Sequence, residues 1–252
     1  MENNVDSILA RLEQLEEAIT YSDPPPPGVP PFRYVVGHSP VLLSAPHGAA
    51  HRRDGRVKHE DEYTAALARL LAERTGASVL YTWARLDDDP NWDRHSPYKE
   101  QLRQLVAAQN IRFVLDIHGM SNRHKFGVAV GTICGASCPQ RHEMLIFDTL
   151  VAEGFRPASA AEAREFPALE QDRFVANHRR FTGGMTNYTV TRFAAEELGV
   201  HAAQFEICAG LRIVRRRNTD KWPGDFRGDP AGIVKIVAAL ERLVRLLGNH
   251  EV

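Results

Sequence analysis

Residues 113–119 read FVLDIHG, an apolar run that ends in Asp116, His118 and a glycine. An apolar run of this length, interrupted only near its end, is typical of a strand buried inside a parallel sheet. Side chains alternate between the two faces of a strand, so Asp116 and His118 point to the same face. We therefore predict a buried strand that presents an aspartate and a histidine together at its carboxyl end.

A second segment has the same form. Residues 41–48 read VLLSAPHG, in which an apolar strand runs into a turn that carries His47. Open α/β sheets bind ligands at the carboxyl ends of their strands. A lone histidine there is more often a hydrogen-bonded turn residue, but two strand-end histidines, each followed by glycine, suit the first two nitrogen ligands of a metal. Asp116 lies near enough in sequence to accept an N–H from the imidazole of His118.

The surrounding chain alternates between strand-like and helical patterns. Strands are predicted at 41–43, 79–81, 113–117 and 202–207, an apolar run continues at 126–133, and helices are predicted at 63–74, 98–108, 142–153 and from Asp229-Pro230 to the carboxyl end. This alternation predicts an α/β domain with a largely parallel sheet.

The amino-terminal part has a different composition. Apolar residues recur every three or four positions through 5–20, which predicts a short amphipathic helix within residues 1–22. This helix either packs on its own domain or pairs with a second copy to form a homo-oligomer. Residues 23–31 are rich in proline and predict an extended linker. The catalytic domain is then expected to span residues 32–252.

Composition narrows the class of protein. The 252 residues hold 31 Lys and Arg against 32 Asp and Glu, so no strong field favours nucleic acid or an anionic membrane as a partner. The three cysteines have no paired spacing, which argues against a disulfide scaffold and favours a reduced, cytoplasmic setting. Neither a secretory leader nor an apolar run of about 18 residues is present in this sequence, so we expect no secretion and no membrane span.

A carboxylate is expected as the third metal ligand, because catalytic zinc usually has three protein ligands. Glu60, Asp61 and Glu62 precede a predicted helix and are the candidates. Acidic residues also suit a helix start through the helix dipole, and this explanation accounts for one or two of them.

Glu206 stands alone inside the apolar strand at 202–207. A carboxylate buried without a partner is costly, so Glu206 is expected to face a cation, a water molecule at a metal or a cleft. A general base that takes a proton from water fits this position. The alternative is a buried ion pair with an arginine.

Taken in order, five segments resemble the N-formylglutamate amidohydrolase family, which is similar to zinc carboxypeptidases and to the succinylglutamate desuccinylase and aspartoacylase group. The resemblance covers roughly residues 40–215. It is carried by residues 44–48 (SAPHG), by Glu60-Asp61 with Tyr63-Thr64 and Leu67, by Arg85 with Asp89 and Asn91, by Phe181 with Gly183-Gly184, and by residues 204–207 (QFEI). The chain departs from the family where Trp92 replaces an arginine after Asn91, and where residues 177–180 (NHRR) replace Asn-Arg-Pro.

The resemblance implies a three-layer sandwich with a central, largely parallel mixed sheet, a phosphorylase/hydrolase-like fold as in zinc carboxypeptidases. It implies a zinc ion held by His47, Asp61 and His118, with Glu62 as a substitute for Asp61, and Glu206 as the catalytic base. The substrate implied is a small N-acyl amino acid or a short peptide. Substrate contacts fall to Arg85, Asn91, Arg94, Gly183 and Gly184, with Arg179 and Arg180 as further candidates for holding a carboxylate or the oxyanion.

Three other functions stay open from the sequence. The nearest is a related metal-dependent deacylase or carboxypeptidase with a different substrate, which Trp92 favours. A second is a non-catalytic metal-binding module of the same fold. The third is nucleophilic catalysis by Cys208 or by a serine, which needs a histidine and acid arrangement that the sequence does not reveal.

Overall fold

An eight-stranded sheet forms the middle layer of the computed structural model, which describes residues 5–217 and 224–249. In spatial order its strands are β1 (Phe32–Val35), β5 (Ser78–Thr82), β2 (Val41–Ala45), β6 (Phe113–Met120), β10 (His201–Cys208), β7 (Phe126–Gly131), β9 (Glu170–Ala176) and β8 (Arg156–Ala158). Neighbours are parallel from β5 to β10 and from β7 to β8, and antiparallel at β1–β5 and β10–β7. The predicted mixed, largely parallel sheet is confirmed.

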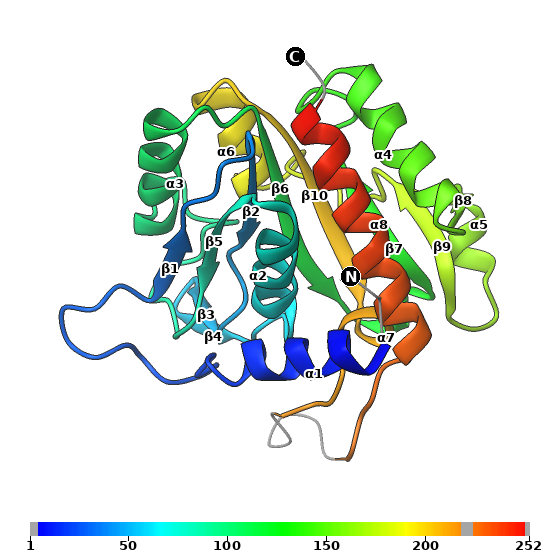
Figure 1. The fold of residues 1–252 in the computed structure, drawn as a ribbon, viewed down its shortest axis with the longest axis horizontal. Helices are drawn as coiled ribbons and strands as arrows, with labels where there is room; N and C mark the ends of the chain where they lie inside the picture. Colours follow the sequence, from blue (N-terminus) through cyan, green and yellow to red (C-terminus); the bar gives the residue numbers. More distant parts are fainter. Residues whose placement is uncertain (1–4, 218–223, 250–252) are drawn as a thin grey trace.

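Helices cover both faces of the sheet, which makes three layers (Figure 1). One face carries α1 (Val5–Glu16), α2 (Thr64–Thr75), α4 (Gln140–Ala152), α7 (Ala209–Arg212) and α8 (Pro230–Asn249), and the other carries α3 (Pro97–Ala108) and α6 (Val190–Glu197). Alternation along β6 explains the two cores, since Leu115 packs into the first and Val114 into the second. The predicted α/β sandwich is therefore the observed architecture.

The strand that holds His118 is longer than predicted. Its pairing with β10 continues to Met120 opposite Cys208, so His118 lies within the strand and not at its end. Gly119 was interpreted as the end of the strand. The strand continues past it because its length is set by pairing with β10, a tertiary interaction that the local sequence does not reveal. Several short elements were also not predicted: β1, β8, β9, α5 (Glu162–Glu165), α6, the 3-10 turn η1 (Asn122–His124) and the hairpin of β3 (His51–Arg53) with β4 (Arg56–Lys58).

The amino-terminal helix packs on the rest of the chain. Ile8, Leu12 and Leu15 of α1 are buried in the same apolar cluster as α2 and α8. The following proline-rich segment is held by backbone hydrogen bonds, from Trp83 N to Pro31 O at 2.9 Å and from Arg85 N to Asp23 O at 2.9 Å. The apolar face of α1 is thus covered within one chain, which matches the first of the two alternatives for this helix.

Glu16, at the end of α1, connects this helix to the start of α2. Its buried carboxylate accepts hydrogen bonds from Tyr21 Oη at 2.5 Å and from the backbone N–H of Tyr63 at 2.7 Å. Tyr63 precedes α2 with φ at 66°, a left-handed conformation that few non-glycine residues adopt. Burial raises the pKa of Glu16 to about 7, although both hydrogen bonds oppose that shift. The carboxylate therefore supplies the acceptor that the start of α2 lacks locally.

The apolar helices of this fold are short or interrupted by charge. Within residues 5–217 and 224–249, no helix combines the length and hydropathy that crossing a bilayer requires.

The raised pKa of Glu16 predicts a pH-dependent effect of Glu16→Gln. The carboxyl has a higher pKa in the folded state than its usual 4.5, so its ionisation destabilises the fold as pH rises from about 4.5 to about 7. Glutamine keeps an acceptor for Tyr63 and does not ionise. We expect Glu16→Gln to gain stability relative to the parent protein between pH 5 and pH 8, by on the order of 3 kcal/mol at most.

Urea denaturation of the metal-free protein at both pH values measures this difference. Glu17→Gln, at an exposed neighbouring position, is the control and should show no such change. An equal effect of Glu16→Gln at pH 5 and pH 8 would contradict the assignment.

Candidate metal site

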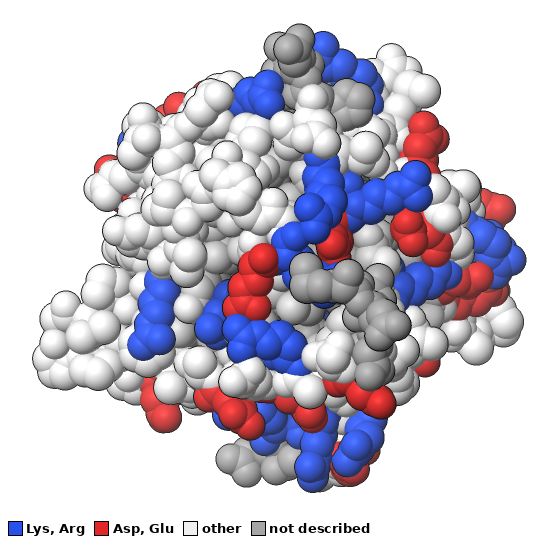
Figure 2. Space-filling view, viewed as in Figure 1, with Lys and Arg blue, Asp and Glu red and all other residues white. Residues whose placement is uncertain are grey.

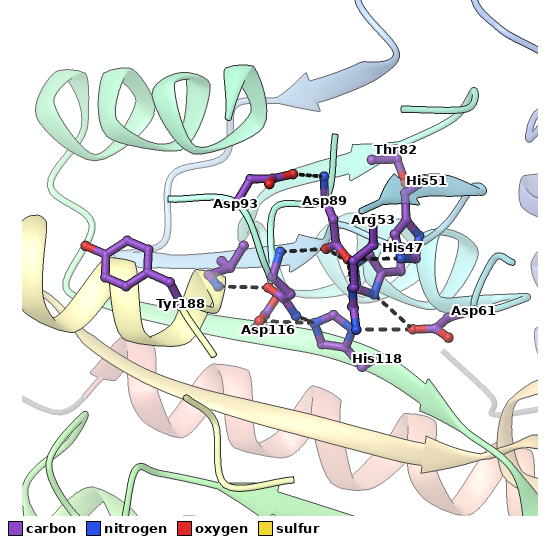
Figure 3. A network of polar contacts seen from close by, with 12 residues as sticks. His47, His51, Arg53, Asp61, Thr82, Asp89, Asp93, Asp116, His118 and Tyr188 are labelled. Atoms are coloured by element: carbon purple, nitrogen blue, oxygen red, sulfur yellow. Dashed lines mark hydrogen bonds and ion pairs between the residues drawn. The ribbon is translucent and has the colours of Figure 1, made fainter. Parts of the chain in front are cut away.

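Two histidines and one aspartate meet at the centre of the sheet. His47 follows β2, His118 lies on the neighbouring strand β6, and their rings are edge to face with centroids 4.8 Å apart. Asp61 lies between the β3–β4 hairpin and α2, and its backbone N–H donates to His47 O at 2.7 Å. Its Oδ2 is 3.7 Å from His47 Nδ1 and 3.3 Å from His118 Nδ1 (Figure 3). The three predicted metal ligands are thus brought together.

The spacing of these three atoms suits a zinc ion. Bonds of about 2.0–2.1 Å at tetrahedral angles place donor atoms about 3.3–3.4 Å apart. The two nitrogen-to-oxygen distances of 3.3 and 3.7 Å lie close to that value, and one ligand atom from each of His47, Asp61 and His118 falls within 4.8 Å of the others. Two imidazoles with one carboxylate form a donor set that zinc commonly takes.

A buried carboxylate lies behind each histidine. Nε2 of His47 is 2.9 Å from Asp89 Oδ1, and Nε2 of His118 is 3.2 Å from Asp116 Oδ2. Both aspartates are fully buried. A carboxylate at Nε2 favours the tautomer with hydrogen on Nε2 and leaves the Nδ1 lone pair for a metal. Both rings therefore turn the same nitrogen toward Asp61.

Asp89 is the centre of a larger hydrogen-bond network. It accepts from Arg53 Nε at 2.6 Å, from the backbone N–H of Asn91 at 2.8 Å, and lies 3.3 Å from His51 Nε2 (Figure 3). The ring of His51 stacks on that of His47 with centroids 3.9 Å apart. His47, His51 and Asp89 are also close enough to form a metal-binding triplet, but the guanidinium of Arg53 already neutralises Asp89 and repels a cation there.

Asp116 has further hydrogen-bond donors, and Asn91 lies beside His118. Asp116 accepts from Ser44 Oγ at 2.9 Å and from Thr191 Oγ1 at 3.3 Å. Asn91 Nδ2 lies 2.8 Å from His118 Nε2, while its Oδ1 accepts the backbone N–H of Val190 at 2.8 Å. Asn91, predicted to contact substrate, lines the cavity beside His118.

Glu206 faces the same cavity from the adjacent strand. It is paired with His118 in the parallel register of β10 and β6, and Gln204 Nε2 donates to its Oε1 at 2.8 Å. Burial raises the pKa of Glu206 to about 7, and the nearby Asp61 raises it further while the two histidines oppose the shift. A carboxyl group with that pKa can both accept and release a proton near neutral pH.

The cavity has a volume of about 430 Å³ and is lined by groups from both halves of the sheet. Three of its lining side chains are cationic: Arg53, Lys58 and Arg180. Arg53 and Lys58 come from the β3–β4 hairpin, which sequence reasoning missed. The pair Asp54-Gly55 between the two strands was the available signal, since Asp-Gly favours a two-residue hairpin turn, and both residues have positive φ, 50° and 73°.

The electrostatics of the ligands show that the site accommodates positive charge. Burial lowers the pKa of His118 and of His47, but the carboxylates around them, Asp116 or Asp89 together with Asp61, jointly outweigh it, so both pKa values are raised. For Asp61 burial works toward a higher pKa, and the two histidines outweigh it and lower the pKa. The carboxylates at this site therefore stabilise added positive charge, which a metal ion would supply.

Some predicted residues lie elsewhere. Arg85 donates to the backbone of Ser22 at 3.1 Å, and neither it nor Arg94 lines the cavity. Arg94 is exposed, 3.5 Å from Glu197. Glu62, the proposed substitute for Asp61, is paired with Arg216 Nε at 3.0 Å. The structure thus places Asp61, and not Glu62, with the histidines.

Gly183 and Gly184 do line the cavity. Their φ angles are 80° and 141°, and Gly183 passes directly against the backbone of Gly131 on β7. Both positions need glycine for conformation and close approach, whatever contact they make with a substrate.

The thiol alternative has no support from the environment of Cys208. This side chain is fully buried, it does not line the cavity, and burial raises its pKa to about 11. A nucleophilic cysteine needs the opposite shift.

The arrangement behind His47 predicts an effect of Asp89→Asn on metal binding. The asparagine weakens the acceptor at Nε2, so His47 should become a poorer and less ordered donor, and zinc affinity should fall about 10- to 100-fold. Competitive zinc titration measures this change. Asp87→Asn, at an exposed position two residues away, is the control. Equal zinc affinity of Asp89→Asn and Asp87→Asn would exclude the role assigned to Asp89.

Comparison with known proteins gives a likeness in fold. No family model matches the chain, and no curated protein matches its sequence. Among solved structures, an N-formylglutamate amidohydrolase from Ralstonia eutropha JMP134 is 14% identical, with 87% of this chain and 97% of that chain covered and a TM-score of 0.53. Bacteroides thetaiotaomicron glutaminyl cyclase bound to N-acetylhistamine is 10% identical over 100% and 99% of the two chains, with a TM-score of 0.50. A putative carboxypeptidase A from Shewanella denitrificans OS-217 is 12% identical over 86% and 60%, with a TM-score of 0.47.

At these identities the likeness concerns the fold. The chain therefore shares its α/β architecture with an N-formylglutamate amidohydrolase, as its sequence resemblance predicted.

Proposed function

We propose that this chain is a zinc-dependent amidohydrolase that cleaves the amide bond of an N-acyl amino acid of the N-formylglutamate type. The observation that carries the proposal is the meeting of His47 Nδ1, His118 Nδ1 and Asp61 Oδ2 in a cavity that Glu206 also lines. Three protein donors with a carboxylate beside them are what metal-assisted hydrolysis requires.

His47, Asp61 and His118 would hold the metal, and Asp89 and Asp116 keep the two imidazoles oriented. When bound, zinc supplies a Lewis acid that polarises the amide carbonyl and lowers the pKa of water at the site toward ~7.

Glu206 is the general base in this proposal. Its carboxylate takes a proton from the attacking water and delivers it to the departing nitrogen. The hydrogen bond from Gln204 fixes one of its oxygens. Its position opposite His118 places it beside the proposed metal ligands.

A substrate carboxylate would be held by Arg180 or Lys58. Both line the cavity, and within the described part of the chain neither forms an ion pair with an aspartate or glutamate. Arg53 also lines it, but its guanidinium is committed to Asp89. Arg180 can thus take the place of the arginine that the resemblance expects after Asn91, where this chain has Trp92.

A related deacylase or carboxypeptidase with a different substrate is the second candidate. It is favoured by the positions of Arg85 and Arg94 outside the cavity, because two of the arginines expected to recognise a glutamate-type substrate are not available there.

Replacement of the base tests the mechanism. Glu206→Gln should bind zinc at the parent stoichiometry but lose turnover by roughly 10² or more, because the amide cannot accept the proton. Elemental analysis and initial-rate measurements give the two quantities. Glu196→Gln on α6, whose partner is a surface arginine, is the control. Parent-like turnover of Glu206→Gln would remove this residue from the mechanism.

Metal removal combined with a substrate screen tests the class of protein. We expect N-acyl amino acids to be hydrolysed faster than short unmodified peptides, activity to vanish on chelation, and zinc to restore it. Hydrolysis that survives chelation would indicate nucleophilic catalysis. A protein that retains no metal and hydrolyses nothing would instead be a binding module, while preference for peptides would indicate the carboxypeptidase alternative.

A further inference from the structure

A second cavity adjoins the one that contains the candidate metal site. Its volume is about 430 Å³, and five cationic side chains line it: Arg123, Lys125, Arg164, Arg179 and Arg180. We call it the basic cavity. Arg180 lines both cavities, so they meet at this side chain. Neither aspartate nor glutamate is among the described residues that line the basic cavity.

Two basic tripeptides and a short helix build this cavity. Residues 123–125 (RHK) follow β6, residues 178–180 (HRR) follow β9, and α5 contributes Arg164. The backbone N–H of Phe181 donates to His178 O at 2.6 Å, so 178–181 is a tight turn with Arg179 and Arg180 at its tip.

Aromatic contacts fix that turn against β7. The ring of His178 packs against Phe126 with centroids 5.4 Å apart, and Phe181 packs edge to face against His124 at 4.8 Å. These contacts hold the backbone of the turn, and the side chains of Arg179 and Arg180 are exposed at its tip.

The positive charge of this cavity is not neutralised by the protein's described carboxylates. Over α2 and α8, basic and acidic side chains are intermingled (Figure 2), as in the ion pairs of Arg74 with Glu241 and of Arg242 with Glu153. In contrast, Arg164, Arg179 and Arg180 form no ion pair within residues 5–217 and 224–249.

The pKa values of the two histidines in the basic cavity are lowered by the same positive charges. Burial lowers the pKa of His178, and the nearby Arg179, Arg164 and Arg180 lower it further. The pKa of His124 is lowered in the same way, by burial first and then by His178 and the arginines at 180 and 123. Like charges held this close repel one another unless an anion lies between them.

We propose that the basic cavity binds a further carboxylate of the substrate, so that the N-acyl amino acid at the metal site is the first residue of an acidic peptide whose next carboxylate lies at Arg164 and Arg179. This inference rests on the proposed function. Guanidinium groups match carboxylates through paired hydrogen bonds, and several separate arginines along a cavity suit several single charges. The shared Arg180 makes the metal-site cavity and this cavity neighbours.

Equilibrium binding tests the proposal without relying on turnover. The probe is fluorescein-labelled tetraglutamate, with labelled tetraglutamine as its uncharged counterpart, and anisotropy is measured on the zinc-loaded protein carrying Glu206→Gln so that the probe is not consumed. We expect tetraglutamate to bind at least about tenfold more tightly than tetraglutamine, with an affinity that falls as salt rises.

Two matched double variants locate the binding site. Arg164→Gln with Arg179→Gln should weaken tetraglutamate binding about tenfold. Arg242→Gln with Arg245→Gln removes the same charge from α8 and should change the Kd less than about twofold. Equal Kd values for the two double variants, or equal affinities for tetraglutamate and tetraglutamine, would overturn the proposal. So would displacement of the probe by inorganic phosphate at lower concentrations than by free glutamate, since this would assign the cavity to a phosphate-bearing ligand.

Kinetics separate this proposal from the proposed function. In the otherwise unchanged protein, Arg123→Gln with Arg164→Gln, two residues that line the basic cavity and not the cavity of the metal site, should raise the KM for an N-acyl acidic peptide about tenfold and leave kcat/KM for a single N-acyl amino acid within about twofold. Loss of both activities alike would overturn the cavity assignment while the hydrolase assignment stands. Arginine-dependent tetraglutamate binding by a protein that hydrolyses nothing would support the cavity and refute the hydrolase.

Discussion

Every feature of the candidate site depends on the burial of two carboxylates, Asp89 and Asp116, behind two imidazoles. A buried charge without partners is costly, so each aspartate must be surrounded by donors. Asp89 obtains them from Arg53, His47, His51 and a backbone N–H, and Asp116 from Ser44, Thr191 and His118. The same contacts that compensate the burial also orient the rings, and this orientation turns both Nδ1 atoms toward Asp61.

The residues at the centre of the site could be predicted because their signals are local. His47 and His118 each follow an apolar run, Asp61 precedes a helix, and Glu206 interrupts an apolar strand. The strand order and register that bring them together depend on pairing between distant segments, such as Glu206 with His118, and only the resemblance pointed to that arrangement. Their roles as ligands and base are proposals.

The outer parts of the site were harder to predict. Arg85 and Arg94 were assigned to substrate from their place in a motif, yet the structure directs them to Ser22 and Glu197. A motif gives sequence neighbours, whereas the direction of a long side chain depends on tertiary contacts. The Asp54-Gly55 pair predicts a hairpin turn, but it does not predict where the hairpin packs against the sheet. Arg53 and Lys58 were therefore missed as residues that line the cavity.

The hydrogen bond between Glu16 and the start of α2 makes the amino-terminal helix part of the same structural unit as the α/β sheet. A helix and a proline-rich segment at one end of a chain suggest an exchangeable appendage, but here the helix supplies an acceptor two residues from Asp61. Because Glu16 contacts both Tyr21 and the backbone of Tyr63, a change of this segment during evolution would require compensating changes at positions 16, 21 and 63. Among homologues we expect these three positions to covary, while the exposed face of the same helix diverges freely.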